Sequence, residues 1–354
     1  MKGNYFLGAD HDPVFEVRDM TFDELGDDEV LVRNKACGVC GTDVHIYHGE
    51  AGSAEVAPPV VLGHEFAGVV EKVGKNVTEL KPGDHVAMDP NMYCGHCDPC
   101  RMGKKQNCEN LFALGVNVDG GFAEFTRTPS SQCFKIDEDI PFTEAAMAEP
   151  LACVLHGIDL ANITPGNSVL VIGGGTIGLL MVQMARLSGA STVILSEPVE
   201  KRRALALELG ADAAIDPINQ DLKEEIRKIT GQDGCNVVIE CVGRPFAVRQ
   251  AIDAAGYNGN ILLFSVPAPD TTVDLPLFDV YKKELHITGS MINPDTHQRA
   301  VNLINGRRLE IGKLITHIFP IEELEEAIHT QMGPDSIKVM VCPKETDSSA
   351  ENQK

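Results

Sequence analysis

Four cysteines lie close together in a loop that also contains glycine and proline. Cys94, Cys97, Cys100 and Cys108 follow the spacing C-x-x-C-x-x-C-x7-C. Four thiolates that converge from one short loop suit tetrahedral zinc, and a site with four protein ligands is closed and structural. An iron–sulfur cluster uses similar ligands, but nothing else in the chain indicates electron transfer. We therefore expect a structural zinc here, with His96 exposed beside it.

A second group of metal-ligand residue types is dispersed along the chain. It consists of Cys40, the adjacent pair His64 and Glu65, and Glu149 in the sequence Ala148-Glu149-Pro150. A thiolate, an imidazole and a carboxylate are all ligands that zinc accepts. Their spacing alone does not separate a catalytic metal site from ordinary core and surface residues.

A glycine-rich segment occurs where an apolar strand pattern changes to a helical one. Residues 169–172 run directly into Gly173-Gly174-Gly175-Thr176-Ile177-Gly178. In a dinucleotide fingerprint Gly173 permits the tight turn, Gly175 lets the backbone approach a pyrophosphate, and Gly178 allows close packing of helix and strand. The first amide groups of the helix would then bind the phosphates. The segment predicts a dinucleotide site.

An acidic residue follows this segment at the distance the fingerprint requires. Glu197 comes at the end of the next expected strand, where a carboxylate accepts hydrogen bonds from the ribose hydroxyls and repels the 2′-phosphate of NADP. NAD is therefore the expected cofactor. Arg202 could contact the adenosine end, or a phosphate if Glu197 swings away. Ile177, Ser265 and Val266 complete the expected cofactor-binding set.

These residues must be positioned by two kinds of structure. Residues 1–155 have short apolar runs separated by glycine and proline, which indicates a β-rich region with long loops. From residue 156, strands alternate with helices, which indicates βαβ units and a doubly wound parallel sheet. We expect residues 156–289 to form a nucleotide-binding domain inserted between 1–155 and 290–354, and a disordered tail over 344–354.

The individual elements follow from the periodicity of apolar residues. Strands are predicted at 168–172, 192–196, 236–240, 260–264, 285–289 and 336–342, and helices at 176–188, 199–209, 220–230, 246–255, 296–305 and 322–330.

Composition excludes several classes of partner. The chain has 354 residues, with 52 acidic and 30 basic side chains and a net charge of -22, which repels phosphate backbones and anionic lipid surfaces. No apolar run reaches the roughly 20 residues that a membrane span needs, and no secretory signal follows Met1. We expect a soluble cytoplasmic protein whose eleven cysteines stay reduced, with no nucleic-acid or membrane partner.

The order of the motifs is similar to that of a known superfamily. The chain resembles the zinc-dependent medium-chain dehydrogenases/reductases from about residue 25 to 342, most closely the polyol (sorbitol/L-iditol) dehydrogenase branch, with L-threonine 3-dehydrogenase and 2,3-butanediol dehydrogenase nearby. The resemblance implies a GroES-like β-rich catalytic domain and a Rossmann domain that binds NAD. The motifs that carry it are residues 38–45, 63–68, the four-cysteine loop, residues 120–125 and the Gly173 segment.

The resemblance also implies roles for the dispersed residues. Cys40 and His64 would bind a catalytic zinc, Glu65 would be the third ligand, and Glu149 would bind the metal directly or through its water. Each chain would then hold two zinc ions and one NAD. As a Lewis acid, zinc lowers the pKa of a substrate hydroxyl, and the carbon that carries it passes a hydride to the nicotinamide.

Three residues of the segment after Cys40 would support this chemistry. By the same resemblance Thr42 hydrogen-bonds the substrate oxygen and relays its proton, and His45 or a water chain carries the proton to solvent. Asp43 would orient His64. Tyr47, Phe112 and Leu114 are expected to line the pocket.

One departure leaves the substrate open. The sorbitol enzymes carry an Arg-Tyr pair where this chain has Ile292-Asn293. A polyol that gives a ketose is the leading expectation, and a polyol phosphate, an acyclic diol such as 2,3-butanediol, and L-threonine are alternatives. A non-catalytic nucleotide-binding or structural member of the fold and a zinc-free quinone reductase are disfavoured because all four metal-ligand candidates are present.

The end of the expected parallel sheet suggests self-association. Residues 285–291 are an apolar strand that would otherwise leave an unpaired edge. Pairing of this edge across a two-fold axis predicts a homodimer or homotetramer.

Overall fold

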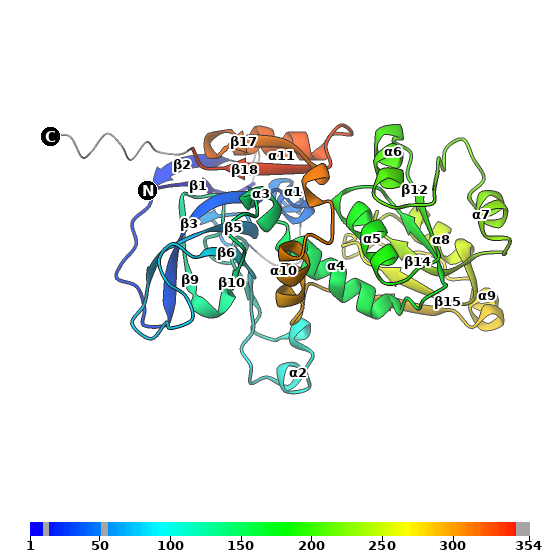
Figure 1. The fold of residues 1–354 in the computed structure, drawn as a ribbon, viewed down its shortest axis with the longest axis horizontal. Helices are drawn as coiled ribbons and strands as arrows, with labels where there is room; N and C mark the ends of the chain where they lie inside the picture. The colour runs from blue at the N-terminus through cyan, green and yellow to red at the C-terminus, as the bar shows by residue number, and fades with distance from the viewer. Residues whose placement is uncertain (10–13, 51–55, 345–354) are drawn as a thin grey trace.

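The computed structural model describes residues 1–9, 14–50 and 56–344. A β-rich part lies at one end of the molecule and a sheet flanked by helices at the other (Figure 1). All of the expected disordered tail except Lys344 lies outside the described residues. No helix among the described residues is long and apolar enough to cross a membrane.

The β-rich part is built around a mixed sheet. Among the described residues it has seven strands, in the order β10-β6-β5-β3-β18-β17 with β9 also on β3. The pairing of β18 with β3 brings the end of the chain into a sheet that residues 29–38 begin. The strands are β3 (Glu29–Gly38), β5 (Glu65–Val73), β6 (His85–Met88), β9 (Phe125–Pro129), β10 (Cys133–Lys135), β17 (Ile315–Pro320) and β18 (Lys338–Cys342).

Smaller elements surround this sheet. A three-stranded sheet and a two-stranded ribbon pack beside it, and short helices connect the strands. These elements are β1 (Lys2–Phe6), β2 (Phe15–Asp19), β4 (Val60–Val61), β7 (Asn91–Met92), β8 (Phe112–Ala113), α1 (Gly41–Tyr47), α2 (Asp98–Arg101), α3 (Phe142–Ala145), α10 (His297–Asn305) and α11 (Leu324–Met332).

The second sheet is parallel throughout and has the order β13-β12-β11-β14-β15-β16. Every residue of β11 is buried, as expected for a strand with helices on both faces. In sheets of this doubly wound order, ligands bind at the carboxyl ends of the strands where the order reverses, which in this sheet is between β11 and β14. The strands are β11 (Ser168–Ile172), β12 (Thr192–Ser196), β13 (Ala213–Ile215), β14 (Cys235–Glu240), β15 (Ala255–Leu263) and β16 (His286–Gly289).

The helices of this half confirm the predicted alternation. The predicted helices lie within two residues of α5 (Thr176–Leu187), α6 (Glu200–Glu208), α7 (Leu222–Thr230) and α8 (Pro245–Ala254). Two elements between residues 168 and 289 were missed. β13 has three residues, too few to show a pattern, and α9 (Leu277–Lys283) has no buried residue and hence no apolar stripe facing a core.

One helix connects the two halves. α4 (Ala148–Ala161) contacts α10, β5 and β6 on the side of the mixed sheet and α5 and β15 on the side of the parallel sheet. It therefore runs across the division expected at residue 155. Its first turn contains Glu149 followed by Pro150, and proline is tolerated there because the first helical amides have no partner within the helix.

A neutral histidine is buried beside α4. His297 begins α10, is 1% exposed, and its ring centroid lies 4.7 Å from that of Phe134. Among the described residues neither ring nitrogen has a hydrogen-bond partner. Burial lowers the pKa of His297 to about 3, because a charged ring would lose its hydration without gaining a partner.

This histidine makes stability depend on pH. The pKa of His297 is lower in the folded than in the unfolded protein, so protonation favours the unfolded state. The contribution of His297 to the free energy of unfolding is therefore complete above about pH 6.5, and it is lost as the pH falls, at up to about 1.4 kcal/mol per pH unit. We expect His297→Leu to remove this loss. Urea unfolding at pH 7.5, 6.5 and 5.5 measures it, with His317→Leu on β17 as the control. Equal pH slopes for the wild type and His297→Leu would contradict the assignment.

Candidate active site

Three of the dispersed ligand candidates meet at the mixed sheet. One ligand atom each of Cys40, His64 and Glu65 lies within 4.8 Å of the other two. Cys40 immediately precedes α1, and Glu65 is the first residue of β5. A Cβ on Gly38 would lie 2.3 Å from Glu65 Oε2, and Gly63 has a φ of +93°. Both glycines are thus needed for the cluster to form.

Asp43 supports this cluster as the sequence predicts. It is fully buried, and its Oδ2 accepts a hydrogen bond from the Cys40 backbone N–H at 2.8 Å. Its Oδ1 lies 3.8 Å from His64 Nδ1. Burial lowers the pKa of His64, but the negative charges of Cys40 and Asp43 outweigh this effect and raise it well above its usual value.

A buried lysine that was not predicted completes the electrostatics. Lys338, at the start of β18, is 2% exposed, forms an ion pair with Glu65, and donates from Nζ to the Val39 carbonyl at 2.9 Å. Burial alone would lower its pKa, but Glu65 and Cys40 raise it more, which keeps the lysine charged. In the sequence, the only feature that could have indicated this ion pair was a single lysine at the start of an apolar terminal strand.

Glu149 faces the same cluster from α4. It is buried, and the Cys153 thiol, one helical turn later, donates to its Oε1 at 3.3 Å. Burial raises the pKa of Glu149 to about 7, with a further rise from Glu65 and an opposing effect of His64. Its carboxylate is not part of the three-residue group that meets within 4.8 Å among the described residues.

The donor set fits a metal ion. A thiol, an imidazole and a carboxylate converge in a buried place, which matches a catalytic zinc with three protein ligands and one open position. Buried atoms of the cluster, His64 Nδ1 and Asp43 Oδ1, lack hydrogen-bond partners among the described residues. A divalent cation would compensate the negative charge gathered here.

The structure places the five residues expected around the pocket in different surroundings. Thr42 and His45 are three positions apart on α1 and so lie on one face of it. Tyr47 instead packs in the core, stacked on Phe15, and its hydroxyl lies 2.8 Å from His329 Nε2 on α11. Of the other two, Phe112 is exposed and Leu114 is buried.

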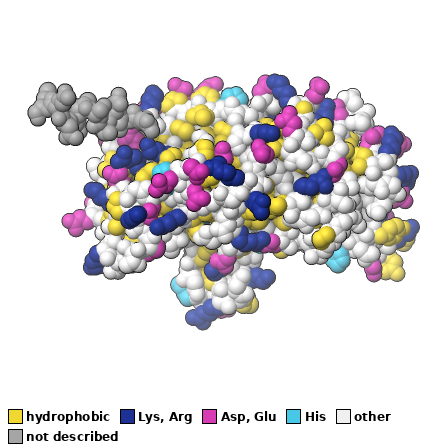
Figure 2. Space-filling model, viewed as in Figure 1, with side chains coloured by type: hydrophobic (Ala, Val, Ile, Leu, Met, Phe, Trp, Pro, Cys, Tyr) yellow, Lys and Arg dark blue, Asp and Glu magenta, His cyan; other side chains and the backbone are white. Residues whose placement is uncertain are grey.

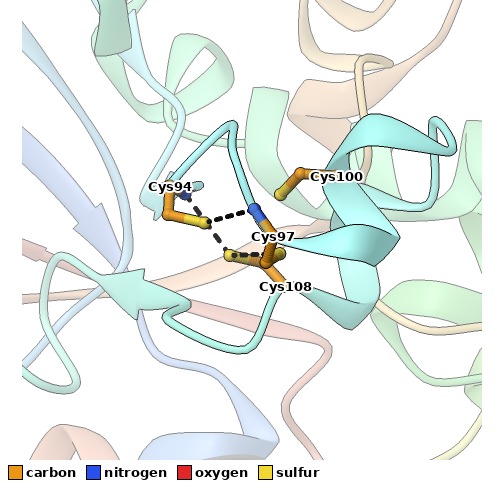
Figure 3. A group of neighbouring side chains, drawn as sticks. All are labelled: Cys94, Cys97, Cys100 and Cys108. Carbon is orange, nitrogen blue, oxygen red and sulfur yellow. Dashed lines mark hydrogen bonds between the residues drawn. The ribbon is translucent and has the colours of Figure 1, made fainter.

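The four-cysteine loop forms a second ligand cluster (Figure 3). Ligand atoms of Cys94, Cys97, Cys100 and Cys108 all lie within 4.8 Å of one another. Backbone amides point at the sulfurs, for example Cys94 N–H to Cys108 Sγ at 3.3 Å. Amide donors lower the pKa of Cys94 and favour the thiolate. His96 is exposed, as predicted, and the cluster has the composition of a structural zinc site.

The glycine segment has the geometry of a phosphate-binding turn. Gly173 has a φ of +97°. A Cβ on Gly178 would lie 1.8 Å from the Gly173 carbonyl oxygen, so helix and strand can approach only with glycine there. A Cβ on Gly175 would meet nothing within 4 Å, which leaves open space over the backbone at the start of α5. These are the three conditions that a bound pyrophosphate requires.

Glu197 lies at the same turn, and it is buried. Its Oε2 accepts the Gly174 N–H at 2.6 Å and its Oε1 accepts the Val199 N–H at 2.9 Å. Arg202 donates from Nη2 to the Ser336 carbonyl at 2.7 Å, and its contact with adenosine stays a prediction. Arg203, which was not predicted, donates to the Glu197 carbonyl at 2.8 Å.

A buried glutamate shapes the neighbouring strand end. Glu240 Oε1 accepts the backbone N–H groups of Val242 and Gly243, at 2.6 and 2.8 Å, and its Oε2 accepts from Ser265 Oγ at 3.1 Å. Ser265 thus lies at the carboxyl edge of the sheet, with Val266 exposed next to it.

Ile292 and Asn293 stand where the sorbitol enzymes have an Arg-Tyr pair, and Asn293 makes its contacts within the protein. Asn293 is fully buried; its Oδ1 accepts from Asn91 Nδ2 at 2.6 Å and its Nδ2 donates to Asp89 Oδ1 at 3.3 Å. Burial raises the pKa of Asp89 to about 6. Ile292 has a φ of +45°, which turns the chain after β16. Because its amide is committed to this network, Asn293 is not free to hold a substrate.

Comparisons with known proteins match both halves of the chain. Residues 26–138 match the alcohol dehydrogenase GroES-like domain, and residues 176–306 match the zinc-binding dehydrogenase family. L-threonine 3-dehydrogenase of Caldanaerobacter subterraneus is 34% identical over 90% of this chain and 93% of its own. Human sorbitol dehydrogenase is 34% identical over 90% of each chain.

A solved structure agrees over nearly the whole length. A zinc-binding dehydrogenase of Sinorhizobium meliloti, crystallised with NADP, superposes with a TM-score of 0.91 at 39% identity, over 97% of this chain and 99% of that one. The GroES-like domain and the parallel sheet predicted from the sequence are therefore confirmed. The chain belongs to the zinc-binding medium-chain alcohol dehydrogenases, oxidoreductases that act on CH–OH groups.

Proposed function

We propose that this protein is a zinc- and NAD-dependent dehydrogenase of a secondary alcohol, with a polyol oxidised to a ketose as its reaction. The observation that carries the proposal is the Cys40–His64–Glu65 group, with His64 and Glu65 buried and Cys40 half-buried, in a chain that also has a phosphate-binding turn at Gly173. Neither feature alone makes a dehydrogenase, but together they supply a place for the alcohol oxygen and one for the hydride acceptor.

The metal sites would be divided between two roles. Cys40, His64 and Glu65 would hold a catalytic zinc, with Glu149 binding directly or through a water. The four cysteines of the loop would hold a structural zinc. The catalytic ion supplies Lewis acidity toward the substrate oxygen when bound. Asp43, whose Oδ1 lies 3.8 Å from His64 Nδ1, would orient His64, and Lys338 is ion-paired with Glu65.

The proton would leave along one face of α1. Thr42 accepts a hydrogen bond from the substrate hydroxyl and passes its proton on, and His45 takes the proton toward solvent. His45 is suited to this because its side chain is partly exposed, so it reaches both the interior and the surface.

The cofactor site fits NAD. The carboxylate of Glu197 lies at the second glycine of the turn, where it would accept the ribose hydroxyls and repel a 2′-phosphate. The Sinorhizobium relative was crystallised with NADP, so the preference must be measured for this chain. The proposed contacts are Gly173, Gly175, Ile177, Gly178, Glu197, Arg202, Ser265 and Val266.

The charges near the site favour a neutral substrate. An amino acid such as L-threonine brings a carboxylate that requires a free cation. Among the described residues Lys338 is the only buried lysine, and it is paired with Glu65. The other buried charged groups nearby, Asp43, Asp89 and Glu149, are acidic and suit hydroxyl donors. L-threonine stays the second candidate because of the similarity to the Caldanaerobacter enzyme.

The proposal also includes the bounds of the two domains and the cellular location of the protein. Residues 1–155 and 290–354 would form the catalytic domain and residues 156–289 the NAD-binding domain, with α4 shared between them. The cytoplasm is the proposed location, because all eleven cysteines are unpaired, as a reducing compartment keeps them.

A homodimer, or a homotetramer built from it, is proposed through the edge of the parallel sheet. β16 pairs only with β15 in the described structure; Ile287 on this strand is exposed, and so is Met291 two residues after it. α9, next to this edge, exposes Leu277, Phe278 and Tyr281. Figure 2 shows apolar side chains at the end of the molecule where Figure 1 places α9. A second copy would cover them by continuing the sheet.

Steady-state rates on sugar alcohols, 2,3-butanediol, a polyol phosphate and L-threonine test the reaction. We expect the highest kcat/KM with a polyol, and at least about a tenfold higher value with NAD than with NADP, since each decade needs about 1.4 kcal/mol of discrimination. Comparable values for both cofactors would mean that Glu197 points away from the ribose. Absence of turnover on every alcohol would refute the proposal.

The two glutamates should differ in their effect on zinc. Glu65→Gln should lose the catalytic zinc and activity together, because a carboxylate ligand is removed from a three-residue site. Glu149→Gln should keep most of the zinc and lower kcat by about 10²-fold. Elemental analysis and kinetics measure both, with the exposed Glu16→Gln as control. Zinc lost from the Glu149 variant and kept in the Glu65 variant would reverse the assignment.

Sedimentation velocity at micromolar concentration tests the association. We expect a dimer or tetramer for the wild type, and a smaller species for Phe278→Asp with Tyr281→Asp, because charged groups would be buried in the interface. Ile218→Asp, a similarly exposed apolar residue, is the control. A monomeric wild type would contradict the interface.

A further inference from the structure

The end of α1 fixes one acidic residue beside His45. Gly49 adopts a φ of +67°, its N–H donates to the Ile46 carbonyl at 3.0 Å, and the Glu50 N–H donates to the His45 carbonyl at 2.9 Å. These two bonds are those of a Schellman motif, which ends a helix with glycine in the left-handed conformation. The backbone of Glu50 is thereby locked to the turn that carries His45.

The side chains of the two residues meet. His45 Nδ1 lies 2.5 Å from Glu50 Oε2. The hydrogen bond from His45 lowers the pKa of Glu50, so the carboxylate is ionised and the proton of the bond belongs to Nδ1. No hydrogen bond to His45 Nε2 occurs within the described part of the chain. In the neutral ring Nε2 is then left as an acceptor.

Two further residues act on this pair. His48, which directly follows α1, and Arg244 each lower the pKa of Glu50 further. Arg244 follows Gly243 in the turn before α8, next to the strand end that Glu240 shapes. The pair therefore lies where α1 faces the cofactor-binding edge of the parallel sheet.

We propose that Glu50 is a positioning residue for proton transfer: its carboxylate fixes the His45 ring with Nδ1 protonated and Nε2 open to receive the substrate proton. The inference rests on the proposed function and on His45 as the group that takes the proton. It assigns to Glu50 a role that the motif from Cys40 to His45 does not contain.

The proton and the hydride of this reaction both come from the alcohol, and no further reactant is needed. The substrate O–H bond breaks, and its proton passes through Thr42 Oγ1 to form an N–H bond at His45 Nε2. A bound nicotinamide cofactor would accept the C–H electron pair as hydride, so that the alcohol becomes a ketone. Glu50 faces the opposite side of the ring and stabilises the imidazolium that forms, as an acidic partner does in other histidine dyads. The imidazolium then releases a proton to water.

The kinetic test compares Glu50→Ala and Glu50→Gln with the wild type. Both residues of the pair are partly exposed, so the expected effect is modest: kcat falls by up to about fivefold, KM for the alcohol stays within about twofold, and the acid limb of the kcat profile moves to lower pH by about 0.5 unit. Glu16→Gln is a matched control, because Glu16 is 54% exposed and Glu50 55%, and both are ion-paired.

A double variant separates positioning from general effects on the loop. If Glu50 acts through His45, Glu50→Ala should lower kcat no further in a His45→Ala background. Additive losses of kcat in the double variant would overturn the proposal. So would a pH profile of kcat for Glu50→Ala in which the acid limb stays at the wild-type pH.

A spectroscopic measurement keeps the inference independent of catalysis. In protein labelled with ¹⁵N-histidine, the neutral His45 ring should have its proton on Nδ1, and Glu50→Ala should move the population toward Nε2–H; a His45→Gln spectrum identifies the signals. A wild-type ring protonated on Nε2 would overturn the role of Glu50. If no alcohol is oxidised but the tautomer is as expected, the proposed function fails while the His45–Glu50 pairing stands.

Discussion

The burial of charge around Glu65 is the constraint on which the rest of the structure depends. A carboxylate away from water is stable only if it is paired and hydrogen-bonded. Lys338 supplies that pairing from a strand near the end of the chain, and β18 must therefore enter the sheet beside β3. Gly38 leaves room for the carboxylate. The Asp43 carboxylate adds further negative charge nearby, which a bound cation would offset.

The parallel sheet could be predicted from the sequence because its signals are local. β11 and β12 have the predicted bounds, since each is a continuous apolar run between a turn and a helix. α9 could not be predicted in this way, because none of its residues is buried and its apolar residues therefore form no stripe that faces a core. The predicted boundary at residue 155 falls inside α4, a helix that contacts strands of both sheets.

The sequence named the three residues that meet in the candidate site, but of the side chains around them it indicated Asp43 and not Lys338. Cys40, His64 and Glu65 belong to short motifs in which glycines flank the ligands. Lys338 has no such motif, and only the pairing of β18 with β3 brings it to Glu65. The role of Glu50 could not be predicted for another reason, because its position beside His45 depends on how α1 ends. The contacts of Asn293 could not be predicted either, since only the fold brings its amide to Asp89 and Asn91.

The central claim is that the buried cluster is a zinc site in a chain that also binds a nicotinamide cofactor. Anomalous diffraction on either side of the zinc absorption edge, from crystals grown without chelator, tests it most directly. We predict two edge-dependent peaks per chain, one among the four cysteines and one bonded to Cys40 Sγ and a His64 ring nitrogen. A fully active protein with no peak at Cys40 and His64 would contradict the account.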